Sequence, residues 1–225
     1  MMSYLNLGAW RRDTFSGAGR SLGRIYAVVA LWSLVVAVGL CAFWRYAAAP
    51  GDGGSPPAHW PAQSRIARDG RPTLMVFAHP LCPCTRATLA ELDRLVAACR
   101  DQFDAHVLFI APEGTDSSWQ DTELVRIARR IPHVTVHVDA GRRETDLFQE
   151  RTSGACLVYD TNGRLLFNGG LTAARGHEGD NPGTDAIKAL MARQGEQSAT
   201  PVFGCPLFEG HDRSPEPKPD SESHS

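Results

Sequence analysis

The sequence has no basic patch and no arginine-rich run, although 23 of its 225 residues are Lys or Arg. Proteins that bind nucleic acid carry clustered positive charge, so this absence argues against DNA or RNA as a partner. No internal repeat is evident, and the formal net charge is only −2. The length therefore fits one globular domain once the two ends of the chain are set aside.

Charge is also missing from residues 25–44, IYAVVALWSLVVAVGLCAFW, a run long enough to cross a bilayer as a helix. Arginines precede this run, and only Arg45 follows closely. The positive-inside bias therefore predicts a cytoplasmic segment at 1–24, a transmembrane anchor at 25–44, and a periplasmic or extracytoplasmic remainder. A cleaved signal peptide is the alternative, but the length of the run and Pro50 after the cleavage-like AAA favour an uncleaved, single-pass anchor in the inner (cytoplasmic) membrane.

Composition divides the rest of the chain into three parts. Residues 45–63 are rich in Ala, Gly and Pro and are expected to form a flexible tether. Residues 64–208 are expected to fold into a domain. The tail at 209–225 contains mainly Ser, Pro and charged residues, and we expect it to be disordered.

Six cysteines are too few for a disulfide scaffold in a chain of this length. Cys41 lies in the predicted anchor. Cys99 and Cys156 continue apolar patterns, and free cysteine packs as a small hydrophobe, so both are predicted to be core residues. The cysteines left for chemistry are Cys82, Cys84 and Cys205.

The folded part is organised around residues 73–86, TLMVFAHPLCPCTR. Its uncharged beginning predicts a strand at 73–78 that is buried on both faces. The apolar residues after Cys84 recur at steps of three and four, which predicts a helix, and Pro83 suits its first position. Cys82 therefore lies at a helix N-terminus, where the partial positive charge favours a thiolate.

Strands and helices are expected to alternate after this point. Apolar runs predict four more strands, amphipathic patterns predict three more helices, and an Asn-Gly pair between the last two strands predicts a hairpin. The element order is β-α-β-α-β-(α)-β-β-α. The later strands are expected at 106–111, 134–138, 155–159 and 165–168, and the helices near 124–131, within 141–151 and at 182–195.

This element order, with cysteine at the first strand-to-helix turn, resembles the thioredoxin fold over residues 64–195. The anchor, tether and central helical insertion resemble membrane-tethered thiol-disulfide proteins of the TlpA/ResA type, and HPxCPCT resembles a thioredoxin-like group called RedB. The resemblance implies an α/β fold, a three-layer domain with a central mixed β-sheet, preceded by one transmembrane helix. It implies a thiol-disulfide oxidoreductase with protein disulfide clients, an electron donor that the sequence does not identify, and no cofactor beyond redox-active cysteines.

Cys82 matches the attacking cysteine of thioredoxin-like proteins, but the family spacing C-x-x-C is absent. Residues i and i+3 share a helix face, so Thr85 is predicted beside the Cys82 sulfur, where its hydroxyl would stabilise the thiolate. Cys84 is badly directed unless the first turn is distorted. It is nevertheless the preferred residue to resolve a mixed disulfide, with Cys205 in the apolar segment 201–208 as the alternative.

Further residues are predicted to support the site. Gly154 stands where the family carries a cis-proline. His79 is a candidate base or metal ligand. The loop after the last strand is expected to leave the sheet at the edge where Cys82 lies, and its polar residues are Arg175, His177, Glu178 and Asp180.

Two other functions remain open. Sco-type copper chaperones also use a thioredoxin fold, and two thiolates with a histidine suit Cu(I). The ligands would be Cys82, Cys84 and either His79 or His177, although the Sco spacing C-x-x-x-C is absent. A thiol peroxidase is the third alternative, because C-x-x-T, here ending at Thr85, occurs in glutathione-peroxidase-like proteins.

Overall fold

The computed structural model describes residues 15–112, 114–115 and 117–208. The predicted disordered tail at 209–225 lies wholly outside these residues. The predicted cytoplasmic segment at 1–24 lies largely outside them. The described chain divides after Tyr46 into a helical unit and a globular unit.

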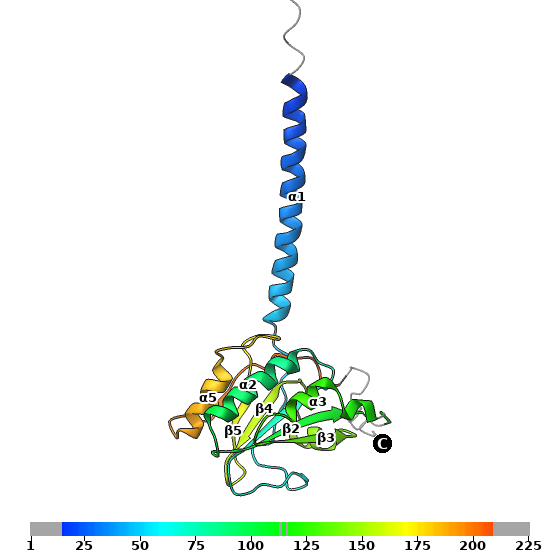
Figure 1. The fold of residues 1–225 in the computed structure, drawn as a ribbon. Helices are drawn as coiled ribbons and strands as arrows, with labels where there is room; N and C mark the ends of the chain where they lie inside the picture. Colours follow the sequence, from blue (N-terminus) through cyan, green and yellow to red (C-terminus); the bar gives the residue numbers. More distant parts are fainter. Residues whose placement is uncertain (1–14, 113, 116, 209–225) are drawn as a thin grey trace, which may run out of the picture. The chain divides into compact units, whose positions relative to one another are not determined.

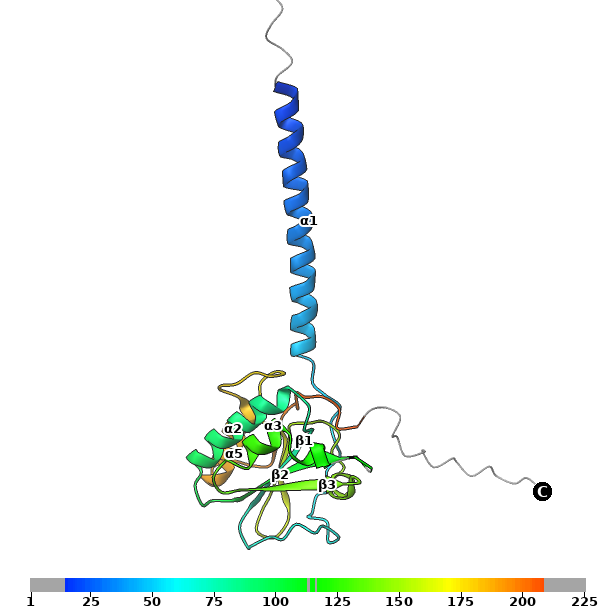
Figure 2. The same cartoon turned by 45° about the vertical axis from the view of Figure 1, so that its right-hand side comes forward.

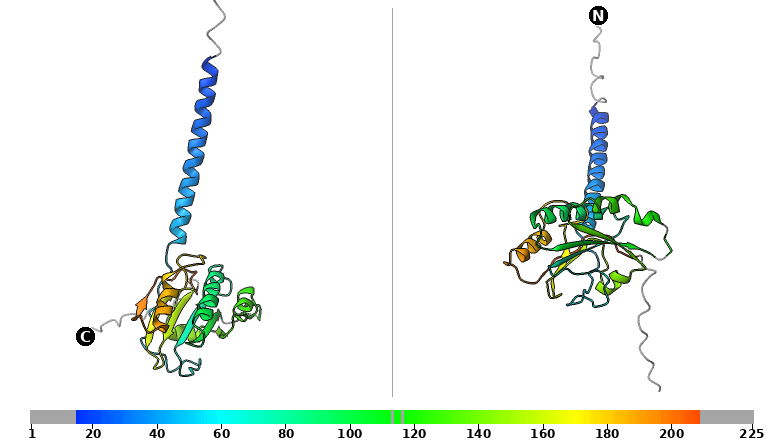
Figure 3. Two further views of the ribbon diagram at one scale, coloured as in Figure 1. Left: turned by 60° about the vertical axis from the view of Figure 1, so that its left-hand side comes forward. Right: turned by 60° about the horizontal axis from the view of Figure 1, so that its bottom comes forward.

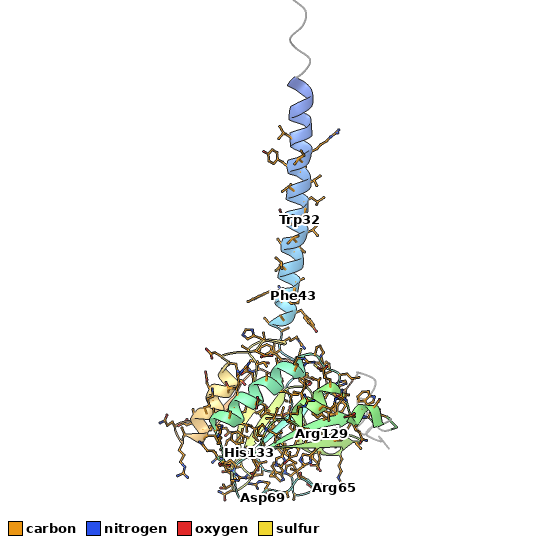
Figure 4. The ribbon with its side chains drawn as sticks, viewed as in Figure 1. Trp32, Phe43, Arg65, Asp69, Arg129 and His133 are labelled. Atoms are coloured by element: carbon orange, nitrogen blue, oxygen red, sulfur yellow. The ribbon has the colours of Figure 1, made fainter. Side chains whose placement is uncertain are left out.

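The helical unit is α1, Phe15–Ala47. Its part from Leu22 to Ala47 is long and apolar enough to cross a membrane, and none of that span is buried. Figure 4 shows Trp32 and Phe43 projecting from this helix, and both are about two-thirds exposed. The predicted span lies within α1, and its composition is one that membrane anchors and signal sequences share.

The globular unit is built on a six-stranded mixed sheet, with strands in the order β3-β2-β1-β4-β5-β6. The central strand β1 runs parallel to β2 and antiparallel to β4. β3 is parallel to β2, and β5 is antiparallel to β4. The strands are β1 (Thr73–Ala78), β2 (Asp104–Ala111), β3 (Val134–Ala140), β4 (Ala155–Tyr159), β5 (Leu165–Gly170) and β6 (Ser198–Ala199).

Helices cover both faces of this sheet. Figures 1 and 2 show α2, α3 and α5 together over one face. The right-hand view of Figure 3 shows the sheet nearly edge-on, with α2 and α3 on one side and α4 on the other. The result is the predicted three-layer α/β arrangement. The helices are α2 (Cys84–Ala98), α3 (Glu123–Ala128), α4 (Arg143–Phe148) and α5 (Pro182–Met191), with a short 3₁₀ helix at Ser117–Gln120.

Every residue of β1 is buried, as its uncharged sequence predicts. Successive side chains of a strand point to opposite faces, so β1 contributes to two cores. Val76 packs in the core under α2, α3 and α5, whereas Phe77 packs in the other core with Phe148 of α4. Cys99 and Cys156 are buried in the first core, which confirms their assignment as core residues.

The segment before β1 differs from the flexible tether that composition predicts at 45–63, because it packs against the domain. The Gly51 N–H donates to the Val202 carbonyl at 2.8 Å. The Tyr159 hydroxyl donates to the Pro57 carbonyl at 3.0 Å. Glycine and proline permit an extended path here, and these hydrogen bonds make that path a cover over the second core.

An extended segment at 198–208, which we call the strap, adds to the sheet beyond β5. It begins with β6, which pairs in parallel with β5, and continues with the Thr200 N–H donating to the Asn168 carbonyl at 3.0 Å. Val202 and Leu207 are buried in the second core. The apolar residues near the end of the described chain are therefore part of the domain.

Candidate active site

The end of β1 and the start of β4 meet at one edge of the sheet, because Phe77 lies opposite Ala155 in the antiparallel pair. The Gly154 N–H donates to the Phe77 carbonyl at 2.7 Å. The His79 N–H donates to the Ser153 hydroxyl oxygen at 2.9 Å. The turn that follows β1 and the turn that precedes β4 are thereby fixed against each other.

Cys82 lies in the turn between β1 and α2. Its N–H donates to the His79 carbonyl at 3.2 Å, and its own carbonyl accepts from the Thr85 N–H at 3.0 Å. Pro83 has the helical angles φ −62° and ψ −28°, so the chain enters α2 directly after Cys82. The Cys82 side chain is only 2% exposed.

Three cysteine sulfurs meet at this edge. The Sγ atoms of Cys82, Cys84 and Cys205 all lie within 4.8 Å of one another, and all three cysteines are free. Cys82 Sγ and Cys205 Sγ are 2.8 Å apart. A disulfide bond is about 2.05 Å long, so these two sulfurs need only a small approach to form one. From the sequence Cys84 is the preferred partner of Cys82, but this short contact is with Cys205.

The strap carries Cys205 to the site by pairing with the chain just before β4. The Ser153 N–H donates to the Cys205 carbonyl at 2.9 Å, and the Leu207 N–H donates to the Arg151 carbonyl at 2.8 Å. The backbone at Gly204 lies so close to Ser153 that a Cβ there would collide with the Ser153 carbonyl. Glycine before Cys205 therefore allows the close approach of the two backbones.

The pKa of the Cys82 thiol is below its ordinary value. Burial acts to raise this pKa, but it is outweighed by hydrogen bonds to the sulfur from the Cys205 thiol and from the backbone N–H groups of Cys205, Cys84 and Thr85. Burial and the neighbouring Cys82 raise the pKa of Cys205 to about 12, and the same two causes raise the pKa of Cys84. Cys82 is therefore the thiol of this group that ionises first.

Of the four polar loop residues expected near Cys82, Arg175 contacts the strap. Its guanidinium donates to the Gly204 carbonyl, and its charge acts to lower the pKa values of Cys84 and Cys205. Two of the expected residues are placed differently. His177 is exposed and is not part of the sulfur group, and the carboxylate of Glu178 pairs with Arg94 on α2 at 2.8 Å.

The hydroxyl of Thr85 has hydrogen-bond partners other than the Cys82 sulfur, which is the partner that its spacing predicts. It donates to the His79 carbonyl at 3.2 Å and shares a 3.0 Å hydrogen bond with the Ser153 hydroxyl. The backbone N–H of Thr85, and not its side chain, is the Thr85 group that acts to lower the pKa of Cys82. Thr85 is buried, so its hydroxyl takes the nearest polar partners, and these belong to the two turns.

His79 and Gly154 both contribute to the backbone of the two turns. His79 Nδ1 accepts from the Leu81 N–H at 3.1 Å, and its ring meets Trp119 edge-on with centroids 5.6 Å apart. Gly154 has φ +92°, which favours glycine, and a Cβ there would lie 3.0 Å from Thr88 Oγ1. The positive φ is thus a conformational reason for glycine at the position where the resembling family carries proline. His79 is not part of the group of three sulfurs.

A hollow of about 320 Å³ lies at the opposite edge of the sheet. Asp104, at the start of β2, is among its lining residues, together with Asp69 and His133, which Figure 4 labels. Cys82 follows the end of β1, and β1 runs parallel to β2, so the hollow and the cysteines are separated by the length of the strands. The hollow is not part of the candidate site.

Comparison with known proteins gives no match to a family model and no match to a curated protein. An uncharacterised conserved protein from Geobacillus kaustophilus and a hypothetical protein from Sinorhizobium meliloti are each 16% identical, with a TM-score of 0.48, over 71% of this chain and 92% and 93% of theirs. The exposed lipoprotein thioredoxin of Streptococcus pneumoniae is 18% identical, with a TM-score of 0.37, over 55% of this chain and 85% of its own.

The fold assignment rests on this chain's own topology. Three parallel strands continue into an antiparallel pair, helices cover both faces, and a cysteine stands between the central strand and the helix that follows it. This is the arrangement that the motif and the element order predict. The globular unit is a thioredoxin-like domain, preceded by a helix long and apolar enough to span a membrane.

Proposed function

We propose that this protein is a membrane-anchored, extracytoplasmic thiol-disulfide oxidoreductase whose redox pair is Cys82 and Cys205. One observation carries the proposal: a thiol with a lowered pKa lies 2.8 Å from a second thiol that the strap holds in place. Thiolates are the attacking species in disulfide exchange, and proximity of the second thiol makes its step intramolecular.

In this function the pair alternates between two thiols and one disulfide. A partner thiolate attacks the Cys82–Cys205 disulfide, forms a mixed disulfide with one sulfur and releases the other as a thiolate. A second partner thiol then attacks the mixed disulfide, so the partner leaves as a disulfide and the pair has gained two electrons. The reverse sequence reduces a client disulfide. The partners are proteins with exchangeable thiols or disulfides, and a separate donor or acceptor restores the pair.

The proposed location follows from the apolar α1 helix and the arginines on its N-terminal side. We expect residues 45–225 to lie outside the cytoplasm and the helix to remain uncleaved in the inner membrane. Alkaline phosphatase and green fluorescent protein fused to the C-terminus test this. Fluorescence without phosphatase activity would reverse the orientation, and a soluble mature form would show that the helix is a cleaved signal sequence.

Exchange activity of single variants tests the redox pair. The full chain in lipid nanodiscs is assayed for reduction of a protein disulfide, with Cys99→Ala as the control because Cys99 belongs to the core. Cys82→Ser and Cys205→Ser should each abolish turnover, whereas Cys84→Ser should keep most of it. Loss of activity in Cys84→Ser with retention in Cys205→Ser would contradict the proposal and make Cys82 and Cys84 the pair.

Copper handling is a second candidate function, supported by the gathering of three sulfurs within 4.8 Å. Cys82, Cys84 and Cys205 would hold the ion, and thiolates suit Cu(I). The sequence-based ligands His79 and His177 are not in this group. Anaerobic Cu(I) titration against a competing chelator tests the idea: tight one-to-one binding that Cys84→Ser weakens would favour it, and binding no tighter than in Cys82→Ser would oppose it. The peroxidase alternative gains no support from the described residues.

A further inference from the structure

We infer, on the basis of the proposed redox pair, that partner thiols enter the Cys82–Cys205 disulfide at Cys205 on the strap. Cys82, the residue at the usual attacking position of the resembling family, then acts as the internal sulfur that leaves. The partner class is a protein dithiol, or two small thiols, and in this direction of exchange the domain accepts the electrons. Three properties of the described site support this order.

The first property is access. Cys82 is 2% exposed, whereas Cys205 is partly exposed. A thiolate attacks a disulfide in line with the S–S bond, from the side opposite the leaving sulfur. Attack on Cys205 comes from the side away from Cys82. Attack on Cys82 would have to reach a sulfur that belongs to a buried residue.

The second property is the firm attachment of the strap around Cys205. The carbonyl of Gly204 accepts from Arg175, and the carbonyl of Cys205 accepts from the Ser153 N–H. Val202 and Leu207, on the two sides of Cys205, are buried in the second core. Opening the strap to expose Cys82 would break all of these contacts together, whereas attack at Cys205 needs none of them to break.

The third property is the stability of the departing thiolate. The backbone N–H groups of Cys84, Thr85 and Cys205 act to lower the pKa of Cys82, so negative charge left on its sulfur is stabilised. Burial and the neighbouring Cys82 instead raise the pKa of Cys205. A more acidic thiol leaves faster in disulfide exchange. Attack at Cys205 therefore expels the better leaving group.

The reaction balances as two exchange steps. In the first, a partner thiolate bonds to Cys205 Sγ, the Cys82–Cys205 bond breaks, and Cys82 leaves as a thiolate. In the second, another partner thiolate attacks the partner sulfur of the mixed disulfide, so Cys205 leaves and takes a proton. The partner is oxidised from two thiols to a disulfide, and the Cys82–Cys205 disulfide is reduced by two electrons.

The first test maps the mixed disulfide directly. The full chain with Cys84→Ser is oxidised in nanodiscs, and peptide mass spectrometry checks for the Cys82–Cys205 disulfide; if that bond does not form, the proposed redox pair itself fails. Glutathione is then added, and samples are quenched in acid at successive times. At the earliest times the adduct should lie on Cys205 in about tenfold excess. An adduct mainly on Cys82, or equally on both, would overturn the inference.

A second test removes the competition between the two sulfurs. Cys82→Ser and Cys205→Ser, each combined with Cys84→Ser, are exposed to oxidised glutathione without denaturant at a series of pH values, which gives the loading rate of each thiolate. The thiolate of Cys205 should load about ten times faster than the thiolate of Cys82, because Cys82 is buried. Formation of an adduct on Cys205 alone supports the same conclusion. Equal loading rates of the two thiolates would overturn it.

Discussion

Replacement of Glu150 should make the stability of the domain less dependent on pH. Glu150 lies between α4 and the residues that hold the strap, and it is 3% exposed. Its Oε1 has no hydrogen-bond partner among the described residues. Burial raises the pKa of this carboxyl from 4.5 to about 7, although the Arg151 N–H donates to it and acts in the other direction.

The sign and size of the effect follow from this pKa. Between pH 4.5 and 7 the folded state keeps a proton that the unfolded chain has lost, so stability falls as the pH rises through this window. At 1.36 kcal/mol for each pKa unit, the loss is roughly 3 kcal/mol above pH 7. Glu150→Gln cannot ionise. It should therefore match the wild type near pH 4.5 and exceed its free energy of unfolding by roughly 3 kcal/mol near pH 8.

Urea denaturation of the full chain in nanodiscs at a series of pH values measures this difference. Trp60, whose ring packs edge-on against Phe148 and Tyr159, reports unfolding by fluorescence. Glu196→Gln is the matched control, because that carboxyl is exposed. The other titrating groups are common to wild type and variant, so they cancel in the difference. A difference that stays constant across the pH range would refute the reasoning.

Three further predictions concern other parts of the domain. Burial, with the nearby charge of His137, lowers the pKa of His106 to about 4, so stability should fall by roughly 3 kcal/mol as pH drops from about 6.5 to 4. His106→Phe should flatten that acid limb in urea titrations, and an unchanged limb would contradict the assignment. Thr85→Val should cost about 1–3 kcal/mol, because the Ser153 hydroxyl loses one of its two hydrogen-bond partners, yet leave the pH profile of Cys82 alkylation nearly unchanged; a large shift would mean that the hydroxyl serves the sulfur. Gly204→Val should displace the strap and speed alkylation of reduced Cys82 about tenfold, whereas Gly53→Ala, with open space around it, should not; equal rates would show that the strap does not shield Cys82.

Much of the fold could be predicted from the sequence because local patterns and global topology agree in this chain. The uncharged run of β1, the Asn-Gly hairpin between β4 and β5, and the Asn181 cap of α5 each encode one element, and the structure contains all three. Cys82 could be placed for the same reason, since a continuous apolar strand ends just before it and an amphipathic helix begins just after it.

The contacts around Cys82 could not be predicted in the same way. Helix periodicity places Thr85 on the same face as Cys82, but it does not say which polar group a buried hydroxyl will choose, and here the choice is Ser153 and the His79 carbonyl. Cys205 is far from Cys82 in sequence. The signal that was available is the apolar segment ending near Phe208, with a glycine before the cysteine.

The most direct test of the account is the cysteine pairing of the oxidised protein with all six cysteines present. The full chain is purified in nanodiscs, oxidised, alkylated at its remaining thiols, digested and analysed by mass spectrometry. We predict a disulfide between Cys82 and Cys205, with Cys84 alkylated. A disulfide between Cys82 and Cys84, with Cys205 alkylated, would contradict the account.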